Sequence, residues 1–341
     1  MKFSHKRLLA VLAAGTLTLS ACGGAGSSEA GGDASNGENQ AVSLMLNWYP
    51  YGEHAPFYYG VEKGIFKDHG IDLEIKAGQG STKTVQAAGQ QQVDFGWADT
   101  PAVLSNIDKG VKVKSMGVYL QTTPSAVQVF ADSGIETAAD LKGKTIAVSA
   151  GDAPTVTFPL FLKAAGLQES DVKQQNLDAA GKMAAVLSDK VDGLIGFAHD
   201  QGPTMAAKSG KEMRYLRYAD EGVNFYSNGL ISSDAYLSEN PELSKEMMAA
   251  VSESFEAAVA DPEAAAKSME GKDPQIPAQP VVLEQWKQTI KLLHTDATEG
   301  MEPGVNDSAD WTATIKTLSD AGLLEDAGKT SKYYDSQYQP K

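Results

Sequence analysis

Strand-like and helix-like hydrophobic periods alternate along this chain, and that alternation limits its fold more than any other feature. Apolar runs suited to buried strands occur near residues 42–48, 71–77, 93–98 and 111–120, with helical patterns between them near 56–69, 84–91 and 101–109. The alternation resumes with strand-like runs near 144–149, 172–177 and 191–197. Strand–helix–strand units of this length form right-handed crossovers in a mostly parallel sheet. The sequence therefore predicts an α/β fold with two lobes, each a mostly parallel sheet flanked by helices.

A weak internal repeat supports a duplicated lobe. Residues 88–99 and 187–200 each end a helix, continue through Val-Asp and follow a strand to an aspartate at its carboxyl end. Chance similarity between two buried strands is the alternative explanation. After residue 228 the pattern is mostly helical, near 241–260, 262–269, 280–293 and 309–321, and we expect this tail to pack on the first lobe. We therefore assign residues 42–128 and 229–341 to lobe 1 and residues 129–228 to lobe 2.

The first 41 residues have the layout of an export signal followed by a tether. A positive start and an apolar stretch at residues 8–19 precede Leu19-Ser-Ala-Cys22, which holds the only cysteine of the chain. This ending resembles the lipobox of bacterial lipoproteins, which implies that residues 1–21 are a lipoprotein signal peptide and that Cys22 becomes lipid-modified. An ordinary signal peptide with a chance cysteine is the alternative. Residues 23–40 contain no large apolar residue, so we expect residues 22–41 to be a lipidated cysteine and a flexible tether.

Charge limits the classes of partner. The chain has 29 Lys and Arg against 44 Asp and Glu, a net charge of −15. Nucleic acids and anionic membrane surfaces attract positive patches, so neither is expected as the main partner. With one cysteine, the chain also has no internal disulfide and no CxxC metal or redox site.

Several motifs carry a family resemblance. They are Leu46-Asn-Trp-Tyr-Pro50, His54-Ala-Pro-Phe-Tyr-Tyr-Gly60, Glu62-Lys-Gly-Ile-Phe66, Gly78-Gln-Gly-Ser81, Val93-Asp-Phe-Gly-Trp-Ala-Asp99 and Asp140-Leu-Lys-Gly-Lys-Thr-Ile-Ala-Val148. In this order they resemble solute-binding proteins for thiamin pyrimidine precursors, aliphatic sulfonates, taurine and nitrate. The resemblance implies a two-lobed periplasmic-binding-protein-like clamp of type II, a monomer that closes on one small solute. It also implies an ABC permease and its ATPase as partners, and an extracytoplasmic location.

Aromatic residues gather where the first strand is expected to end. Six of the residues 48–59 are aromatic, whereas 8% of the whole chain is. Open parallel sheets bind ligands at the carboxyl ends of their strands, so flat side chains here suit stacking on a heteroaromatic ring. Packing in the core is the alternative role for Tyr58. The candidate ligand contacts of this segment are Asn47, Trp48, Tyr49, His54 and Tyr58.

Other strand ends carry further candidates. The glycine loop at residues 78–82 leads into a helix whose free N–H groups can hold an anionic or carbonyl oxygen, although Ser81 and Asp99 are equally suited to capping helices. Equivalent turns of lobe 2 and the return to lobe 1 supply the rest. These candidates are Gly80, Ser81, Thr82, Asp99, Gly151, Asp152, Phe197, His199 and Tyr226. Because no nucleophile elbow or HExxH motif accompanies His199, we expect no catalytic residue, metal or cofactor.

The arginine count bears on the ligand. Beyond residue 22 the chain has two arginines, Arg214 and Arg217, both in an expected strand away from the cleft loops. A bidentate arginine clamp for an anion is therefore not expected. A flat nitrogen heterocycle such as a thiamin pyrimidine precursor fits better, with a sulfonate, taurine or nitrate-type anion as the alternative. A pyrimidine-synthase-like enzyme is a rival, but the family's enzymes carry a cysteine-rich motif that Cys22 alone does not supply. A surface adhesin or signalling lipoprotein is the other rival.

Overall fold

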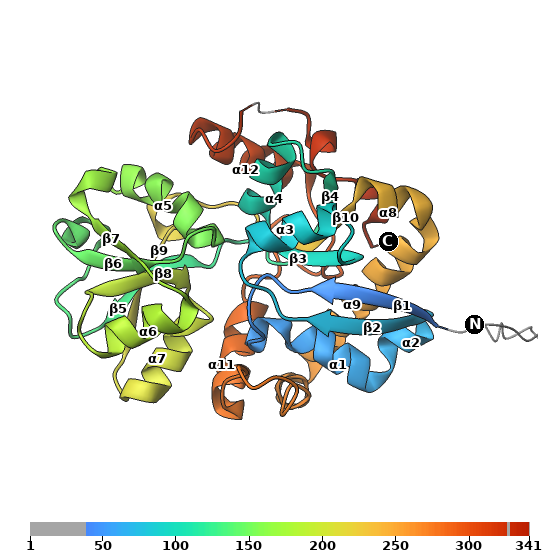
Figure 1. Cartoon of the computed structure of the whole chain (residues 1–341), viewed down its shortest axis with the longest axis horizontal. Coiled ribbons are helices and arrows are strands. Elements are labelled where there is room, and N and C mark those ends of the chain that lie inside the picture. Colours follow the sequence, from blue (N-terminus) through green and yellow to red (C-terminus); the bar gives the residue numbers. More distant parts are fainter. Residues whose placement is uncertain (1–38, 326–327, 341) are drawn as a thin grey trace, which may run out of the picture. The chain divides into compact units, whose positions relative to one another are not determined.

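The computed structural model describes residues 39–325 and 328–340. These residues belong to one compact unit, Glu38–Lys341, built around two five-stranded sheets (Figure 1). The expected signal peptide, Cys22 and nearly all of the expected tether lie outside the described residues. Among the described helices, none is long and apolar enough to cross a membrane.

The first sheet has the strand order β2-β1-β3-β10-β4. Its strands are β1 (Gln40–Met45), β2 (Ile71–Lys76), β3 (Phe95–Asp99), β4 (Val113–Val118) and β10 (Asn228–Ser233). β1 pairs in parallel with β2 and β3, whereas β10 runs antiparallel between β3 and β4. The helices that connect these strands are α1 (Ala55–Lys63), α2 (Ile65–Asp68), α3 (Ser81–Gly89) and α4 (Thr100–Asp108).

The second sheet repeats this arrangement with the order β7-β6-β8-β5-β9. Its strands are β5 (Ser125–Phe130), β6 (Thr145–Val148), β7 (Lys173–Asn176), β8 (Gly193–Phe197) and β9 (Met213–Arg217), and its helices are α5 (Ala153–Ala164), α6 (Ala179–Leu187) and α7 (Gln201–Ser209). β6 is parallel to β7 and β8, and β5 is antiparallel to β8 and β9. In each sheet one strand, β10 or β5, runs antiparallel to its neighbours, and it comes directly after the chain has crossed over from the other sheet. The shared order is what a duplicated lobe would produce.

The chain passes between the sheets at residues 119–124 and again at residues 218–227. All of β5, Ser125–Phe130, pairs within the second sheet, so the lobe limit expected at 128/129 falls inside this strand. The limit expected at 228/229 falls after the first residue of β10, which belongs wholly to the first sheet. Every residue of β5 is buried, so its sequence lacks the alternation of buried and exposed residues from which the ends of a strand can be predicted.

Five α-helices follow β10 in the described part of the chain. They are α8 (Asp234–Glu239), α9 (Pro241–Ala260), α10 (Pro262–Lys267), α11 (Gln279–Ile290) and α12 (Ser308–Asp320). Helix α9 packs closely on α1 of the first lobe, and α11 also contacts α7 of the second lobe. A Cβ atom added at Gly60 of α1 would lie only 2.0 Å from the Ser254 hydroxyl of α9, so a larger residue does not fit there. Edge-to-face contacts of the Phe57 ring with Trp97 and Phe255, at centroid distances of 5.0 and 5.7 Å, join helix, sheet and tail in one core.

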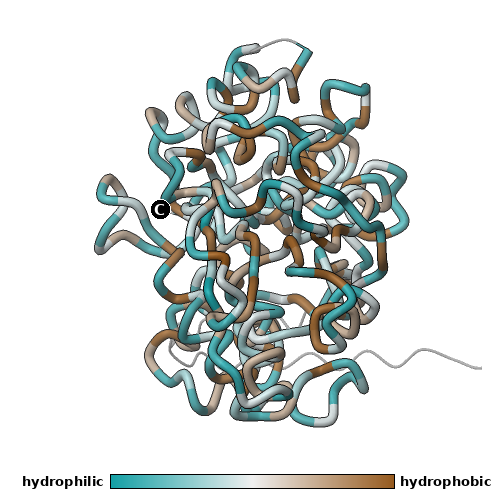
Figure 2. Tube along the Cα trace, turned by 90° about the vertical axis from the view of Figure 1, so that its left-hand side faces the viewer, coloured by the Kyte–Doolittle hydropathy of each residue, from teal (hydrophilic) through white to brown (hydrophobic). Residues whose placement is uncertain are grey.

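Short 3-10 helices complete the described elements. They are η1 (Gly52–His54), η2 (Ala138–Leu141), η3 (Glu169–Asp171), η4 (Ala219–Glu221), η5 (Thr330–Lys332) and η6 (Ser336–Tyr338). Hydrophobic stretches of the chain run through the interior of the trace, and hydrophilic stretches are frequent at its outside (Figure 2). Proline in the first turn of α1, α4, α5 and α9 fits the known preference for this position, where the missing N–H has no helical partner.

Candidate functional site

The loops that follow β1 and β8 meet between the two sheets and enclose a small cavity. Its volume is about 30 Å³. Both lobes supply its walls. The lining residues are Asn47, Trp48, Tyr51, Gly80, Ser81, Asp152, Ala153, Pro154, Lys182, Gly196, Phe197, Asp200 and Gln201.

A larger cavity of about 620 Å³ shares the Trp48 side of this site. Because Trp48 lines both spaces, its indole lies at the boundary between the inner and the outer cavity. The outer cavity is also lined from both lobes. Its other lining residues are Tyr49, Ala77, Gly78, Gln79, Lys83, Ser149, Ala150, Asn176, Leu177, Asp178, Ala180 and Gln275.

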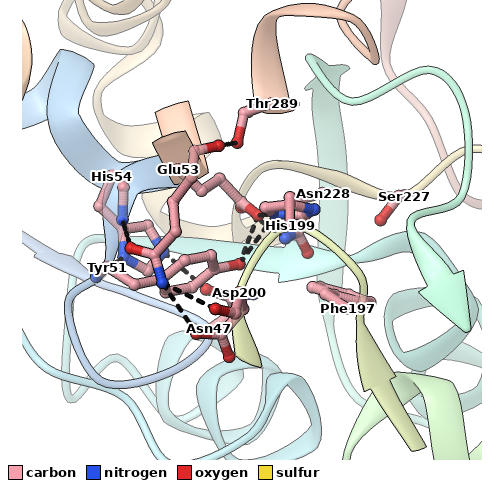
Figure 3. Close-up of polar contacts among 12 residues, drawn as sticks. Asn47, Tyr51, Glu53, His54, Phe197, His199, Asp200, Ser227, Asn228 and Thr289 are labelled. Carbon is pink, nitrogen blue, oxygen red and sulfur yellow. Dashed lines mark hydrogen bonds and ion pairs between the residues drawn. The ribbon is translucent and has the colours of Figure 1, made fainter. Parts of the chain in front are cut away.

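A buried carboxylate, Glu53, holds the inner side of the site together. Its Oε1 atom accepts hydrogen bonds from the Trp97 indole and the Asn228 amide, each at 2.6 Å. Its Oε2 atom lies 2.7 Å from His199 Nε2 and accepts a hydrogen bond from the Tyr51 hydroxyl (Figure 3). Four side chains therefore converge on one carboxylate, from the residue before η1, from β3, from β10 and from the loop after β8.

The electrostatics of Glu53 favour its ionised form. Burial raises the pKa of a carboxyl group, but the hydrogen bond and charge of His199, together with His54 and Tyr51, outweigh burial and lower the pKa of Glu53 to about 2. The neighbouring His54 behaves in the opposite way, since burial lowers its pKa to about 4. A neutral His54 donates from Nε2 to Asn47 Oδ1 at 2.8 Å and accepts the Tyr51 N–H at Nδ1, which fixes the aromatic loop from behind.

Direct hydrogen bonds connect the two lobes beside the cavity. The Tyr49 hydroxyl donates to the two carboxylate oxygens of Asp200 at 3.0 and 3.2 Å. Gln285 of α11 accepts the Gly52 N–H at 2.9 Å and donates to the Asp200 carbonyl oxygen at 2.8 Å. With the contact between Glu53 and His199, these bonds hold the lobes against one another.

Two buried aspartates bind protons unusually tightly. Burial raises the pKa of Asp99 to about 8, although the hydrogen bond from the Ser227 hydroxyl lowers it. Burial likewise raises the pKa of Asp200 to about 7, against the effects of Tyr49 and Lys182. Both groups therefore change protonation near neutral pH and can donate or accept a hydrogen bond there.

Several buried polar atoms at this site have no hydrogen-bond partner among the described residues. Unpartnered buried polar groups are rare in folded proteins and point to a missing partner. Both donors and acceptors are included, which suits a polar heterocycle better than a purely apolar ring. Trp48 Nε1 and Gln201 Oε1 belong to residues that line the inner cavity, whereas Asp99 Oδ2, His199 Nδ1 and Asn228 Oδ1 belong to residues that line neither cavity.

The structure brings most of the candidates together. Those that line the inner cavity are Asn47, Trp48, Gly80, Ser81, Asp152 and Phe197, and Tyr49 lines the outer one. His54 and His199 lie directly behind, each hydrogen-bonded or stacked to a lining residue. The Asp99 N–H donates to the Ser81 hydroxyl at 3.1 Å, and a Cβ atom at Gly80 would lie 3.5 Å from the Gly151 carbonyl oxygen.

Three candidates lie elsewhere. Tyr58 packs against the core of the first lobe, where burial, with the charge of Asp273, raises its pKa to about 12. Tyr226 is buried edge-on against Trp311 with a centroid distance of 5.3 Å, and its hydroxyl donates to the Asp307 carbonyl oxygen. Thr82 lines neither cavity. Tyr58 and Tyr226 therefore lie in packed surroundings away from both cavities, and core packing was the alternative role given for Tyr58.

Several important residues were not among the candidates, including the lining residue Asp200. Glu53 stands between aromatic residues in a strand-end loop, and a lone carboxylate there was the available signal. Lys182 is the single charged residue of the apolar helix α6, Ala179–Leu187, which also marks it in the sequence. Gln285 had no such signal, because its role depends on α11 packing beside Gly52. In the described part of the chain, no group of His, Cys, Asp and Glu side chains is arranged to hold a metal ion.

Comparison with known proteins fits this architecture. The profile of the family described as NMT1/THI5 like matches residues 52–265, more than half of the chain. The chain belongs to the NMT1/THI5-like family. The riboflavin-binding protein RibY of Chloroflexus aurantiacus is 26% identical to it over 308 residues, which are 88% of this chain and 86% of RibY. The formylaminopyrimidine-binding protein of Halalkalibacterium halodurans is 23% identical over 290 residues, 84% of this chain and 87% of that protein.

Solved structures confirm the fold of this NMT1/THI5-like chain. The periplasmic aliphatic sulphonate binding protein SsuA of Escherichia coli superposes with a TM-score of 0.67 at 16% identity, over 88% of this chain and 92% of SsuA. The predicted α/β clamp with two mostly parallel sheets is thus confirmed, as is the family resemblance that the motifs indicated.

Proposed function

We propose that this NMT1/THI5-like protein is an extracytoplasmic solute-binding lipoprotein of an ABC importer. It captures a small flat heterocycle, such as a thiamin pyrimidine precursor, between its lobes and delivers it to the permease. One observation carries the proposal: Trp48 of lobe 1 and Phe197 of lobe 2 line the same cavity, among buried polar atoms that have no protein partner. Aromatic walls with a few convergent polar groups are the usual composition of a small-molecule site.

The charges around the inner cavity favour a neutral or weakly basic ligand. The charged lining residues are Lys182, Asp152 and Asp200, and the first two form an ion pair with a distance of 2.8 Å. Because Asp152 already neutralises Lys182, the lining offers an anion no free cation, and an ionised Asp200 would repel it. A sulfonate, taurine or nitrate-type anion is therefore the less favoured ligand.

Capture needs movement of the lobes but no covalent step. Both lobes line the inner cavity, so a solute held there touches both, and we expect the lobes to separate when it enters. A solute that touches both lobes then favours the state in which they meet, because it gains its full contacts only there. Lipid at Cys22 and a tether to residue 41 would keep this unit near the permease, and we treat the anchor as part of the proposal.

Calorimetric titration of the unit Glu38–Lys341 tests the ligand class. Aminopyrimidines should give saturable heat with one site per chain, whereas taurine and alkanesulfonates should give none. Tight sulfonate binding without pyrimidine heat would overturn the heterocycle proposal in favour of the anion-binding alternative. Small-angle scattering on the same samples should show a compaction with the bound solute. A curve that no solute changes would favour an adhesin or signalling role.

A further inference from the structure

Lys182 is a cation in a place where cations are rarely found. It lies on α6, whose other residues are uncharged, and its side chain is only 1% exposed. Its Nζ atom donates to Asp152 Oδ2 and to the Ile195 carbonyl oxygen, each at 2.8 Å. The ammonium also lies 5.8 Å from the centre of the Trp48 ring, directly at the wall of the inner cavity.

Asp152 is held in place by a second contact. It occupies the N-cap position of α5, and its Oδ1 atom accepts the Thr155 N–H at 3.0 Å. The other oxygen is thereby directed at Lys182. A buried charge without a partner is strongly unfavourable, so this carboxylate compensates the ammonium within the protein itself.

We infer that the Asp152–Lys182 pair sets the charge selectivity of this binding site. Asp152 occupies the position on Lys182 that the acidic group of an anionic solute would otherwise take. The site therefore admits uncharged or protonated solutes and rejects sulfonates and carboxylates of the same size. This inference takes one point from the proposed function, namely that the solute binds in the inner cavity.

Exchanging the internal carboxylate for an amide tests the inference. Asparagine has the shape of aspartate and is an equally good helix cap, so Asp152→Asn leaves Lys182 as an uncompensated cation at the cavity wall. Titration with methanesulfonate should show at least tenfold tighter binding to this variant than to the original chain. The double variant Asp152→Asn with Lys182→Met should lose that gain, because the cation is gone.

Two controls separate this effect from others. Asp132→Asn makes the same change of net charge in an exposed pair with Lys211, away from both cavities, and should leave methanesulfonate binding as it was. If Asp152→Asn does not melt cooperatively, Asp152→Ser carries the test, since serine also caps helices.

The outcomes for the inference and for the proposed function are distinct. Methanesulfonate binding that Asp152→Asn does not improve overturns the inference, even if aminopyrimidines bind the original chain. Binding of methanesulfonate to the original chain that Lys182→Met abolishes also overturns it, since Lys182 would then be open to anions. Tighter methanesulfonate binding to Asp152→Asn, without any aminopyrimidine binding to the original chain, supports the inference and refutes the heterocycle proposal.

Discussion

The substitution Glu53→Gln should destabilise the folded protein by about 3 kcal/mol at pH 7. Glutamine resembles protonated glutamate in shape and charge, so its effect follows from the preference of the fold for ionised Glu53. The pKa of Glu53 falls from 4.5 to about 2, and each pKa unit corresponds to about 1.4 kcal/mol. Four hydrogen bonds to a charged group would suggest a larger loss, but the burial of the charge offsets part of their contribution.

Urea unfolding at several pH values measures this loss. The folded pKa is depressed, so the contribution of Glu53 is present above its unfolded pKa near 4.5 and is lost as pH falls towards 2. The original chain should therefore approach the Glu53→Gln variant in stability below pH 4. Glu62→Gln, at an exposed position of α1, is the matched control and should change stability by less than about 0.5 kcal/mol. A loss under about 1 kcal/mol in Glu53→Gln at pH 7 would refute the central role of this carboxylate.

Three further predictions concern the buried aspartate and the aromatic loop. The pKa of Asp99 in the folded protein is raised to about 8, so its contribution to the free energy of unfolding should fall by about 2 kcal/mol as pH rises from 6.5 to 8. Asp99→Asn should remove this pH dependence in urea unfolding. The same pH dependence in both proteins would contradict the prediction. Trp48→Ala should weaken heterocycle binding by about 1–3 kcal/mol, roughly fivefold to 150-fold, in calorimetry. An unchanged Kd would exclude stacking on this indole. Tyr49→Phe removes the hydrogen bond from the hydroxyl to Asp200, which contributes about 1 kcal/mol to the contact between the lobes, so heterocycle binding should weaken about fivefold. Unchanged binding would show that this bond does not aid closure.

The fold could largely be predicted because its elements follow simple periodic patterns. Helix α9 lies at Pro241–Ala260, where the proline start and the apolar stripe placed it. Strands that are buried on both faces were harder to delimit. The pattern in β5 is Ser-Ala-Val-Gln-Val-Phe, in which Gln128 is buried and donates to the Phe197 carbonyl oxygen, so its polarity does not mark a solvent face. Only the pairing with β8 and β9 shows to which sheet this strand belongs.

The site was partly predictable for a similar reason. Strand ends of a parallel sheet share one edge, so Trp48 could be placed near Ser81 in lobe 1 and Asp152 near Phe197 in lobe 2. The two-lobed clamp that the resemblance implies placed these two edges opposite each other. Glu53 and Lys182 could not be placed in this way, because a charge is expected at the surface unless a partner compensates it. Their partners, His199 and Asp152, come from other segments of the chain, and pairing at such separations is visible only in three dimensions.

The direct bonds between the lobes determine how much a solute must contribute to closure. The Tyr49 hydroxyl, the Glu53 carboxylate and the Gln285 amide each reach across the lobes, to Asp200 or His199. At about 1 kcal/mol net for a typical hydrogen bond, these contacts together favour lobe contact by about 3 kcal/mol without any solute. A solute shifts the equilibrium only through the difference between its affinities for the two states. If the solute is a small heterocycle, as we propose, it needs to supply only part of the energy of closure, because the protein supplies the rest through these contacts.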